Sequence, residues 1–225
     1  MADDTVGIFE EDAGIFFTEK CVVAYLRLAK ENGAEILGSE SVLSFSESDD
    51  RIVLGTNRDS YISDKLILTA GPWISSLVPQ LKNLFQAERQ ILFRIRNKVS
   101  FFENPPADLR VYKWEFKDDE ILYGFPDLGN GLKVANPTAG TDCHPDTVDR
   151  EASEEEKRYI VTLVERYMHI NPIVGQAAVC MYKNTKDGHF LIDYHPDGRH
   201  VVLQARVRDM DSSCLLIPEK YLQPW

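Results

Sequence analysis

The chain reads Ile121-Leu122-Tyr123-Gly124-Phe125 and then, after a short gap, Leu132-Lys133-Val134-Ala135. Both runs consist mostly of apolar and aromatic residues, and the gap contains proline, aspartate, asparagine and glycine, which favour turns. Two such runs joined by a short turn-forming segment are typical of neighbouring antiparallel strands. The fold is therefore expected to contain an antiparallel sheet.

Further β-like segments precede this pair and are separated by charged or Pro/Gly-containing turns: Ile91–Ile95, Val99–Phe102 and Val111–Phe116. Consecutive strands with short connections favour an antiparallel arrangement. Two later strands are expected at Ala177–Tyr182 and His200–Ala205, with the short apolar run Phe190–Ile192 between them.

One helix is predicted between these two groups of strands. Ser153 and Glu156 have the spacing of a capping box, in which each side chain bonds the backbone N–H of the other residue. The apolar residues that follow share one helix face: Ile160, Leu163, Val164 and Tyr167. Pro172 lies just beyond the expected end of the helix.

Another helix is predicted near the N-terminus, starting at Thr18, whose hydroxyl is expected to cap the first free N–H groups. An apolar stripe with helical spacing follows: Val22, Tyr25, Leu26 and Ala29. Gly33 supplies a C-terminal stop, and the run Ala34–Leu37 after it is expected to form a strand. A helix that leads into a strand indicates an α/β unit.

After this unit, Arg51–Thr56 and Ser60–Thr69 are β-rich runs separated by polar turn formers, so a hairpin is expected. The second run ends in four apolar or β-branched residues and passes at once into Ala70-Gly71-Pro72-Trp73. This pattern indicates a buried strand that breaks into a tight turn where backbone closely approaches another group. The alternative is that the turn serves only to end the strand.

The chain has 225 residues, of which 44% are hydrophobic and 27% charged, a composition that suits one or two packed cores. Its formal net charge of −11 disfavours nucleic acids and anionic lipid surfaces as partners. No apolar stretch approaches the roughly 18 to 20 residues that cross a bilayer, and the first residues lack the pattern of a signal peptide. An intracellular protein with neither nucleic acid nor membrane as a partner is expected.

Four cysteines occur singly: Cys21, Cys143, Cys180 and Cys214. Because they contain no C-x-x-C pair, they form neither a zinc knuckle nor a dithiol redox motif, and free thiols are expected in a reducing compartment. The five histidines do not join with Glu or Cys in a recognised ligand pattern. No metal site is predicted.

The most specific signal is the run Ala178-Val179-Cys180-Met181-Tyr182, followed by Thr185, Asp187, residues 189–193 and His195-Pro196. It closely resembles the family of monomeric sarcosine oxidase, N-methyltryptophan oxidase and pipecolate oxidase, which oxidise secondary amino acids with FAD. The resemblance extends in order from about Gly14 to Ala205. It includes residues 14–34 and 64–73, and Tyr123-Gly124-Phe125-Pro126 with Gly131-Leu132-Lys133.

The resemblance implies an α+β fold, with an antiparallel-sheet substrate domain and an incomplete α/β FAD-binding domain. Residues 83–186 correspond to the substrate domain, residues 14–82 and 187–205 correspond to the FAD-binding domain, and the tail 206–225 diverges. The implied reaction is oxidation of a secondary or N-methyl amino acid, such as sarcosine or pipecolate, with O₂ as the acceptor. The products are hydrogen peroxide and an imine that hydrolyses to an aldehyde.

The resemblance also implies which residues bind FAD. Cys180 corresponds to the cysteine whose sulfur is joined covalently to the flavin, although a cysteine between apolar neighbours is otherwise most often a small core residue. Ala70 and Gly71 correspond to a turn that brings backbone against the cofactor. Trp73 stands where the family usually has an aromatic residue.

Three residues are implied to act in catalysis. Lys133 resembles the lysine that sits over the flavin and assists the reaction with oxygen, because a fixed ammonium stabilises developing negative charge. On spacing alone, Lys133 is equally well an exposed strand lysine. Tyr123 and Tyr182 resemble residues that line the substrate pocket, whereas tyrosines on strands are commonly packing residues.

The chain departs from the family pattern at both ends. It contains neither the G-x-G-x-x-G turn nor the Arg-bearing segment that grips the substrate carboxylate, and other residues replace the family's glycine-rich stretch after Ala205. Pro137 stands where sarcosine oxidases often have a histidine. These departures suggest a fragment, a splice variant or a frameshifted product that does not hold FAD tightly.

Two alternatives stay open on the sequence alone. The first is a truncated, catalytically inactive relative that cannot retain FAD. The second is an oxidase of another amine, such as a glycated amino acid or a saccharopine-like substrate. The expected location is cytoplasmic, or peroxisomal if a eukaryotic parent chain carries a targeting tripeptide, which Leu222–Trp225 does not contain. The sequence favours no particular oligomeric state.

Overall fold

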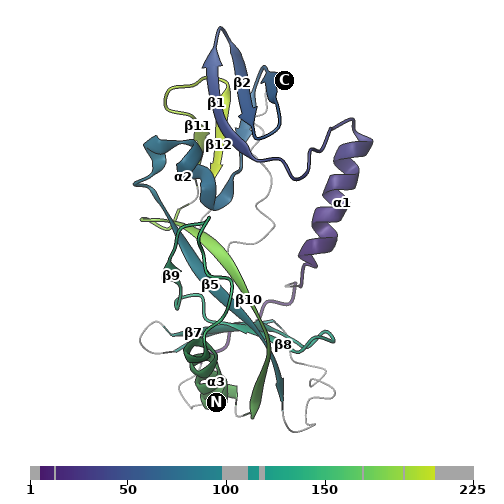
Figure 1. Ribbon diagram of the computed structural model, residues 1–225. Helices are drawn as coiled ribbons and strands as arrows, with labels where there is room; N and C mark the ends of the chain where they lie inside the picture. Colours follow the sequence, from purple (N-terminus) through teal and green to yellow (C-terminus); the bar gives the residue numbers. More distant parts are fainter. Residues whose placement is uncertain are drawn as a thin grey trace. The chain divides into compact units, whose positions relative to one another are not determined.

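The computed structural model describes residues 6–12, 14–97, 111–116, 120–168, 170–189 and 191–205 (Figure 1). The chain separates into two compact units, Met1–Ile36 and Leu37–Trp225. The predicted strand Val99–Phe102 lies outside the described residues, as do Phe190, Cys214 and the tail 206–225.

The first unit contains α1 (Thr18–Glu31), which begins where the sequence predicted a helix. The N-cap residue is Phe17 and no side chain caps the helix, so the predicted cap by the Thr18 hydroxyl is wrong. Thr18 already belongs to the first helical turn, one position beyond the cap. Gly33 follows the helix with a φ of 88°, a left-handed conformation that glycine adopts without strain, and this confirms its role as a stop.

The rest of the predicted α/β unit does not form. Residues 34–37 form no strand, contrary to the prediction. Val22, Tyr25 and Leu26 of the apolar stripe are exposed, and α1 has no buried residue. Periodicity identifies an amphipathic face, but burial of that face needs a partner surface, and the described residues of this unit supply none.

The second unit begins with an antiparallel sheet of β1 (Val42–Ser48), β2 (Arg51–Thr56) and β3 (Ser60–Ser63), in that order. The β2–β3 hairpin was predicted and is confirmed, whereas β1 was not predicted. β1 joins β2 through Asp49 and Asp50, whose φ values of 51° and 60° make a tight two-residue turn. Aspartate tolerates this backbone better than most residues do, which explains the turn.

The run Ser60–Thr69 is not one continuous hairpin strand. β4 (Leu66–Leu68) instead pairs in parallel with β12 (Val201–Ala205), which pairs antiparallel with β11 (Leu191–Tyr194). The predicted hairpin is therefore too long. A β-rich pattern predicts a strand but does not specify which partner strand it joins.

Three short helical segments follow β4: η1 (Gly71–Trp73), α2 (Ile74–Leu77) and η2 (Pro79–Leu81). The segment from α2 to η2 packs with residues of β2, β4, β12 and the following Phe85 in one hydrophobic core. The buried members of this core are Ile52, Leu68, Ile74, Val78, Leu81, Phe85, Val201, Leu203 and Ala205.

The largest sheet contains two long strands, β5 (Phe85–Asn97) and β10 (Pro172–Thr185), which run antiparallel side by side (Figure 1). The strand order is β10-β5-β8-β7-β6, and β9 pairs with β5. The described pairings are all antiparallel, which confirms the predicted sheet. The remaining strands are β6 (Tyr112–Glu115), β7 (Ile121–Phe125), β8 (Leu132–Ala135) and β9 (Thr141–Asp142).

α3 (Glu154–Met168) packs against one face of this sheet and forms a second core. Ser153 Oγ accepts a hydrogen bond from the Glu156 backbone N–H at 3.2 Å, and Glu156 Oε2 accepts one from the Ser153 N–H at 2.7 Å. The predicted capping box is thus confirmed. The buried members of the second core are Phe93, Ile95, Leu122, Val134, Ile160, Leu163 and Val164.

We expect Ser153→Ala to lower the free energy of unfolding by about 1 kcal/mol, because the Glu156 N–H loses its acceptor. Urea denaturation followed by circular dichroism measures this change. The matched control is Thr162→Ala, since the Thr162 hydroxyl donates to the Arg158 carbonyl within the helix, and it should change stability by less than about 0.5 kcal/mol. Equal losses in both variants would contradict the capping role.

Candidate active site

The large sheet has two different faces. Alternate residues of a strand point to opposite faces, and Phe93 and Ile95 of β5 pack with the buried residues of α3. The face opposite α3 therefore carries the alternate residues of β5, namely Glu88, Gln90, Leu92 and Arg94. We call it the site face.

The register of β10 places two predicted site residues on the site face. Cys180 is the cross-strand partner of Gln90, and Tyr182 is the partner of Glu88. Because the residues of a cross-strand pair share one face, Cys180 and Tyr182 lie on the site face.

The registers of β7 and β8 place two more predicted residues there. Lys133 pairs with Arg94, and Ala135 pairs with Leu92, so both residues of β8 lie on the site face. Tyr123 of β7 pairs with Ala135 and shares this face. Four predicted residues from three strands therefore lie on one surface.

The two tyrosines meet at their hydroxyl groups. Tyr123 Oη and Tyr182 Oη lie 3.4 Å apart, although β8 and β5 separate β7 from β10. Both side chains are half-buried. They reach toward each other over the site face and present two hydroxyls, each of which can donate or accept a hydrogen bond.

Lys133 lies at another part of the site face. Its Nζ lies 4.4 Å from the centroid of the Phe125 ring on neighbouring β7, a cation–π contact that holds the ammonium in place. Its cross-strand partner Arg94 donates from Nη1 to the Gly131 carbonyl at 3.4 Å. Two neighbouring cations make this part of the site face suitable for an anionic group.

Cys180 is the exposed thiol among the described cysteines, while Cys21 and Cys143 are partly buried. Burial raises the pKa of the Cys143 thiol, which makes its thiolate scarcer. Because covalent attachment needs an accessible thiolate, Cys180 is the described cysteine that fits a link to a flavin ring. The nearby Tyr182 side chain suits a flat aromatic system.

Ala70, Gly71 and Trp73 come from the segment around η1. Gly71 has a φ of 53°, a left-handed conformation that favours glycine. Cα atoms of η1 come within 8 Å of Cα atoms of β10, so the turn lies beside the strand that carries Cys180. Trp73 Nε1 donates to Asp146 Oδ1 at 2.7 Å, and Trp73 as a whole is 39% exposed.

The site face also carries a polar cluster that the sequence did not predict, which we call the Glu88 cluster: Glu88, Gln90 and Asn184. Gln90 Nε2 donates to Glu88 Oε1, and Asn184 Nδ2 donates to Glu88 Oε2. Gln90 is only 4% exposed and also donates to the Pro137 carbonyl at 3.0 Å. No local motif marks these residues, because the register of β5 against β10 brings them together.

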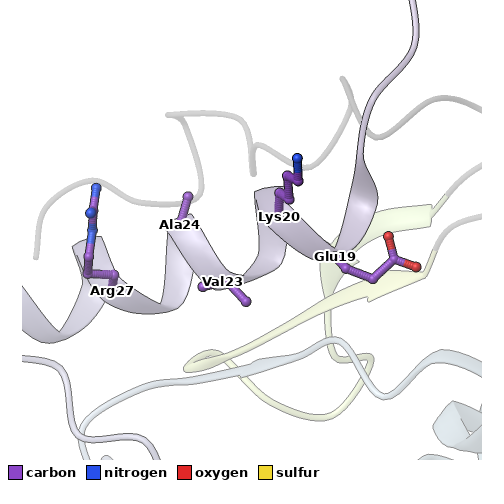
Figure 2. Close-up of a pocket in the computed structure, with 5 residues that line it drawn as sticks. All are labelled: Glu19, Lys20, Val23, Ala24 and Arg27. Atoms are coloured by element: carbon purple, nitrogen blue, oxygen red, sulfur yellow. The ribbon is translucent and has the colours of Figure 1, made fainter. Parts of the chain in front are cut away.

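A separate cavity of about 350 Å³ lies on α1 and is lined by Glu19, Lys20, Val23, Ala24 and Arg27 (Figure 2). All five residues come from one helix and none is a predicted site residue. Within the described ranges, no group of three His, Cys, Asp or Glu side chains is placed to hold a metal ion. No helix in that same part of the chain is long and apolar enough to cross a membrane.

Comparisons with known proteins match the chain to FAD-dependent oxidoreductases. A family model described as FAD dependent oxidoreductase matches residues 2–208. Monomeric sarcosine oxidase of Bacillus sp. (strain B-0618) is 37% identical over 205 residues, covering 88% of this chain and 52% of the relative. N-methyl-L-tryptophan oxidase of Salmonella heidelberg (strain SL476) is 27% identical over 207 residues, covering 87% of this chain and 52% of the relative. The chain spans about half the length of the curated relatives it matches.

Two solved structures share the fold. The open form of NikD, described as an unusual amino acid oxidase essential for nikkomycin biosynthesis, matches with a TM-score of 0.70 at 15% identity, covering 85% of this chain and 52% of that chain. Glycine oxidase from Geobacillus kaustophilus matches with a TM-score of 0.61 at 18% identity, covering 82% of this chain and 47% of that chain. The expected α+β fold with antiparallel sheets is thereby confirmed.

Proposed function

Because the chain belongs to the FAD dependent oxidoreductase family, we propose that it takes part in the oxidation of a secondary or N-methyl amino acid of the sarcosine or pipecolate type. The observation that carries this proposal is the meeting of Tyr123 and Tyr182 on the face that also bears Lys133 and Cys180. The names of the relatives, which are oxidases of sarcosine and N-methyl-L-tryptophan, support the choice of substrate. When bound, FAD would accept two electrons from the substrate and pass them to O₂, giving hydrogen peroxide.

Each residue has a role that suits its position. Cys180 would hold the flavin ring through its accessible sulfur, and the turn at Ala70-Gly71 would bring backbone close to the cofactor. Lys133, fixed over an aromatic ring, would stabilise negative charge that develops during the reaction with O₂. The Tyr123 and Tyr182 side chains would line the substrate pocket and orient the bound amino acid.

The same proposal assigns the parts of the chain. Residues 83–186 would form the substrate domain, and residues 14–82 and 187–205 would contribute to the FAD-binding domain, which Trp73 would help to line. The parallel pairing of β4 with β12 supports this division, because it joins the two separated FAD-binding segments in one core. The second core, built from β5, β7, β8 and α3, lies within the substrate segment.

Acid precipitation of the expressed chain tests the covalent link. The chain is expected to hold FAD only weakly, but a covalent bond retains even the fraction that reacts. After incubation with excess FAD, we therefore expect some flavin to stay with the precipitated wild type and with the matched control Cys143→Ser. We expect Cys180→Ser to release its flavin, because it lacks the accessible sulfur. Intact mass spectrometry should show one added FAD on the first two proteins only.

Retention of flavin by precipitated Cys180→Ser would contradict the assignment. A colourless wild type at its apo mass would favour the alternative of a truncated relative that cannot retain FAD. Where flavin is retained, peroxide release with sarcosine, pipecolate and a fructosyl amine would identify the preferred class of amine. Activity confined to the fructosyl amine would reject the proposed substrate.

A further inference from the structure

In the part of the chain that the structure describes, neutral side chains hold the Glu88 carboxylate in place. Its two oxygens accept hydrogen bonds from the side-chain amides of Gln90 and Asn184. Among the described residues, no lysine, arginine or histidine forms an ion pair with Glu88. The amides occupy part of the hydrogen-bonding capacity of the carboxylate but do not balance its charge.

A second acceptor lies beside this carboxylate. Asn184 Oδ1 is buried, and within the described part of the chain it has no hydrogen-bond partner. A buried acceptor without a donor is unfavourable, and a ligand N–H would satisfy it. The Glu88 cluster therefore offers a negative charge and a neutral acceptor side by side, which is complementary to a cation with more than one N–H.

The protein holds the carboxylate firmly at this place. Gln90 is buried and is anchored on its other side by the Pro137 carbonyl. The backbone at Gly140 packs so closely that a Cβ there would collide with Glu88 Oε1 and Gln90 Nε2. Tyr182 is the cross-strand partner of Glu88, so the carboxylate adjoins the pair of tyrosines.

We propose that Glu88, together with Asn184 Oδ1, binds the ammonium group of the substrate and so selects molecules that carry this group over molecules of the same shape that lack it. This inference rests on the proposed function, which supplies the amine substrate. A secondary ammonium carries two N–H groups, one for each acceptor. Charge-assisted hydrogen bonds of this kind are stronger than neutral ones, so Glu88 would determine specificity.

Binding to the chain without flavin tests the proposal. We would titrate ¹⁵N-labelled protein with sarcosine and with methoxyacetate, in which an ether oxygen replaces the amine, and follow the chemical shifts. The wild type should bind sarcosine at least about tenfold more tightly than methoxyacetate. Glu88→Gln should lose at least about tenfold in sarcosine affinity and keep its affinity for methoxyacetate within about twofold.

Two further variants separate the effect of the Glu88 charge from the effects of other changes. Glu115→Gln removes an exposed carboxylate that pairs with Lys113 on β6, and this matched control should behave as the wild type. Asn184→Ala removes the neutral acceptor and keeps the charge of Glu88, so it should weaken sarcosine binding by about three- to tenfold. This second variant also serves if Glu88→Gln fails to fold.

Unchanged sarcosine affinity in Glu88→Gln or in Asn184→Ala would overturn the proposal. Equal losses of affinity for sarcosine and methoxyacetate in a variant would also overturn it, because they indicate a structural role for the residue. A wild type that binds the two ligands equally tightly would overturn it as well. Since the assay needs no flavin, it is independent of the attachment test. If the chain retains no flavin but binds sarcosine through Glu88, the ammonium site is supported and oxidation by this chain is not. If the chain retains flavin but binds sarcosine and methoxyacetate equally, the ammonium site is rejected and the proposed oxidation is not.

Discussion

Gly124→Ala is expected to lower the free energy of unfolding by about 3 kcal/mol or more, because the added methyl group has no space. A Cβ at Gly124 would collide with the Lys133 carbonyl oxygen and the Tyr112 hydroxyl, and would lie 2.6 Å from Tyr112 Cζ. The carbonyl belongs to β8, which pairs with β7, so it cannot move without disturbing the sheet. The Tyr112 side chain is partly buried, and burial raises the pKa of its hydroxyl well above the usual range.

Urea denaturation of the variant measures this loss. The matched control is Gly175→Ala on β10, where the nearest atom to a Cβ would be the Arg94 carbonyl oxygen at an ordinary 3.4 Å. We expect that variant to remain within about 1 kcal/mol of the wild type. Equal stability of the two variants would show that the sheet adapts around residue 124, contrary to the prediction.

Lys183→Met is expected to raise the free energy of unfolding at pH 7 by about 2 to 3 kcal/mol. Lys183 is only 6% exposed, and its Nζ lies 4.6 Å from the centroid of the Phe85 ring. Burial disfavours the charged ammonium and lowers the pKa of Lys183 from 10.5 to about 8. Below pH 8 the folded chain must bury this charge, a cost that methionine avoids while it fills a similar space.

The pH dependence of the stability difference between Lys183→Met and the wild type tests whether a buried ammonium causes it. Between pH 8 and pH 10.5 the unfolded chain keeps the Lys183 proton and the folded chain releases it, so the contribution of Lys183 to stability rises with pH. The advantage of Lys183→Met should therefore shrink across this window. Denaturation of both chains at each pH removes the effect of groups common to both, such as Cys143.

Lys186→Met is the control for that experiment, because Lys186 is exposed in the turn after β10. It should change stability by less than about 0.5 kcal/mol at every pH. A Lys183→Met advantage that is equally large at pH 7 and pH 10 would contradict a buried ammonium as its cause.

The sequence predicted well those elements whose causes are local. The capping box at Ser153 depends on two residues three positions apart, and the strands β7 and β8 match their predicted bounds. The predictions failed where a distant segment decides the outcome. Residues 34–37 have strand composition and form no strand, and the run 60–69 divides between two sheets.

In the candidate site, too, local motifs were predicted and groups brought together by distant segments were not. Tyr123, Tyr182, Lys133 and Cys180 were identified through motifs that lie in register with a known family, and the structure adds that they share one face. Glu88 was not identified, because a single glutamate on a strand carries no local signal. Its partner Asn184 lies 96 positions away in the sequence.

The sequence by itself determined the local hydrogen-bonding and hydrophobic patterns of this protein, and with them the antiparallel sheet, the helix at 154–168 and the family. Only the tertiary structure decided which distant groups meet: the two tyrosine hydroxyls, the Glu88 cluster and the buried Lys183 over Phe85. The physical reason is that alternation along a strand indicates which side chains share a face, whereas strand order and register decide their neighbours. Order and register depend on packing between segments far apart in the chain.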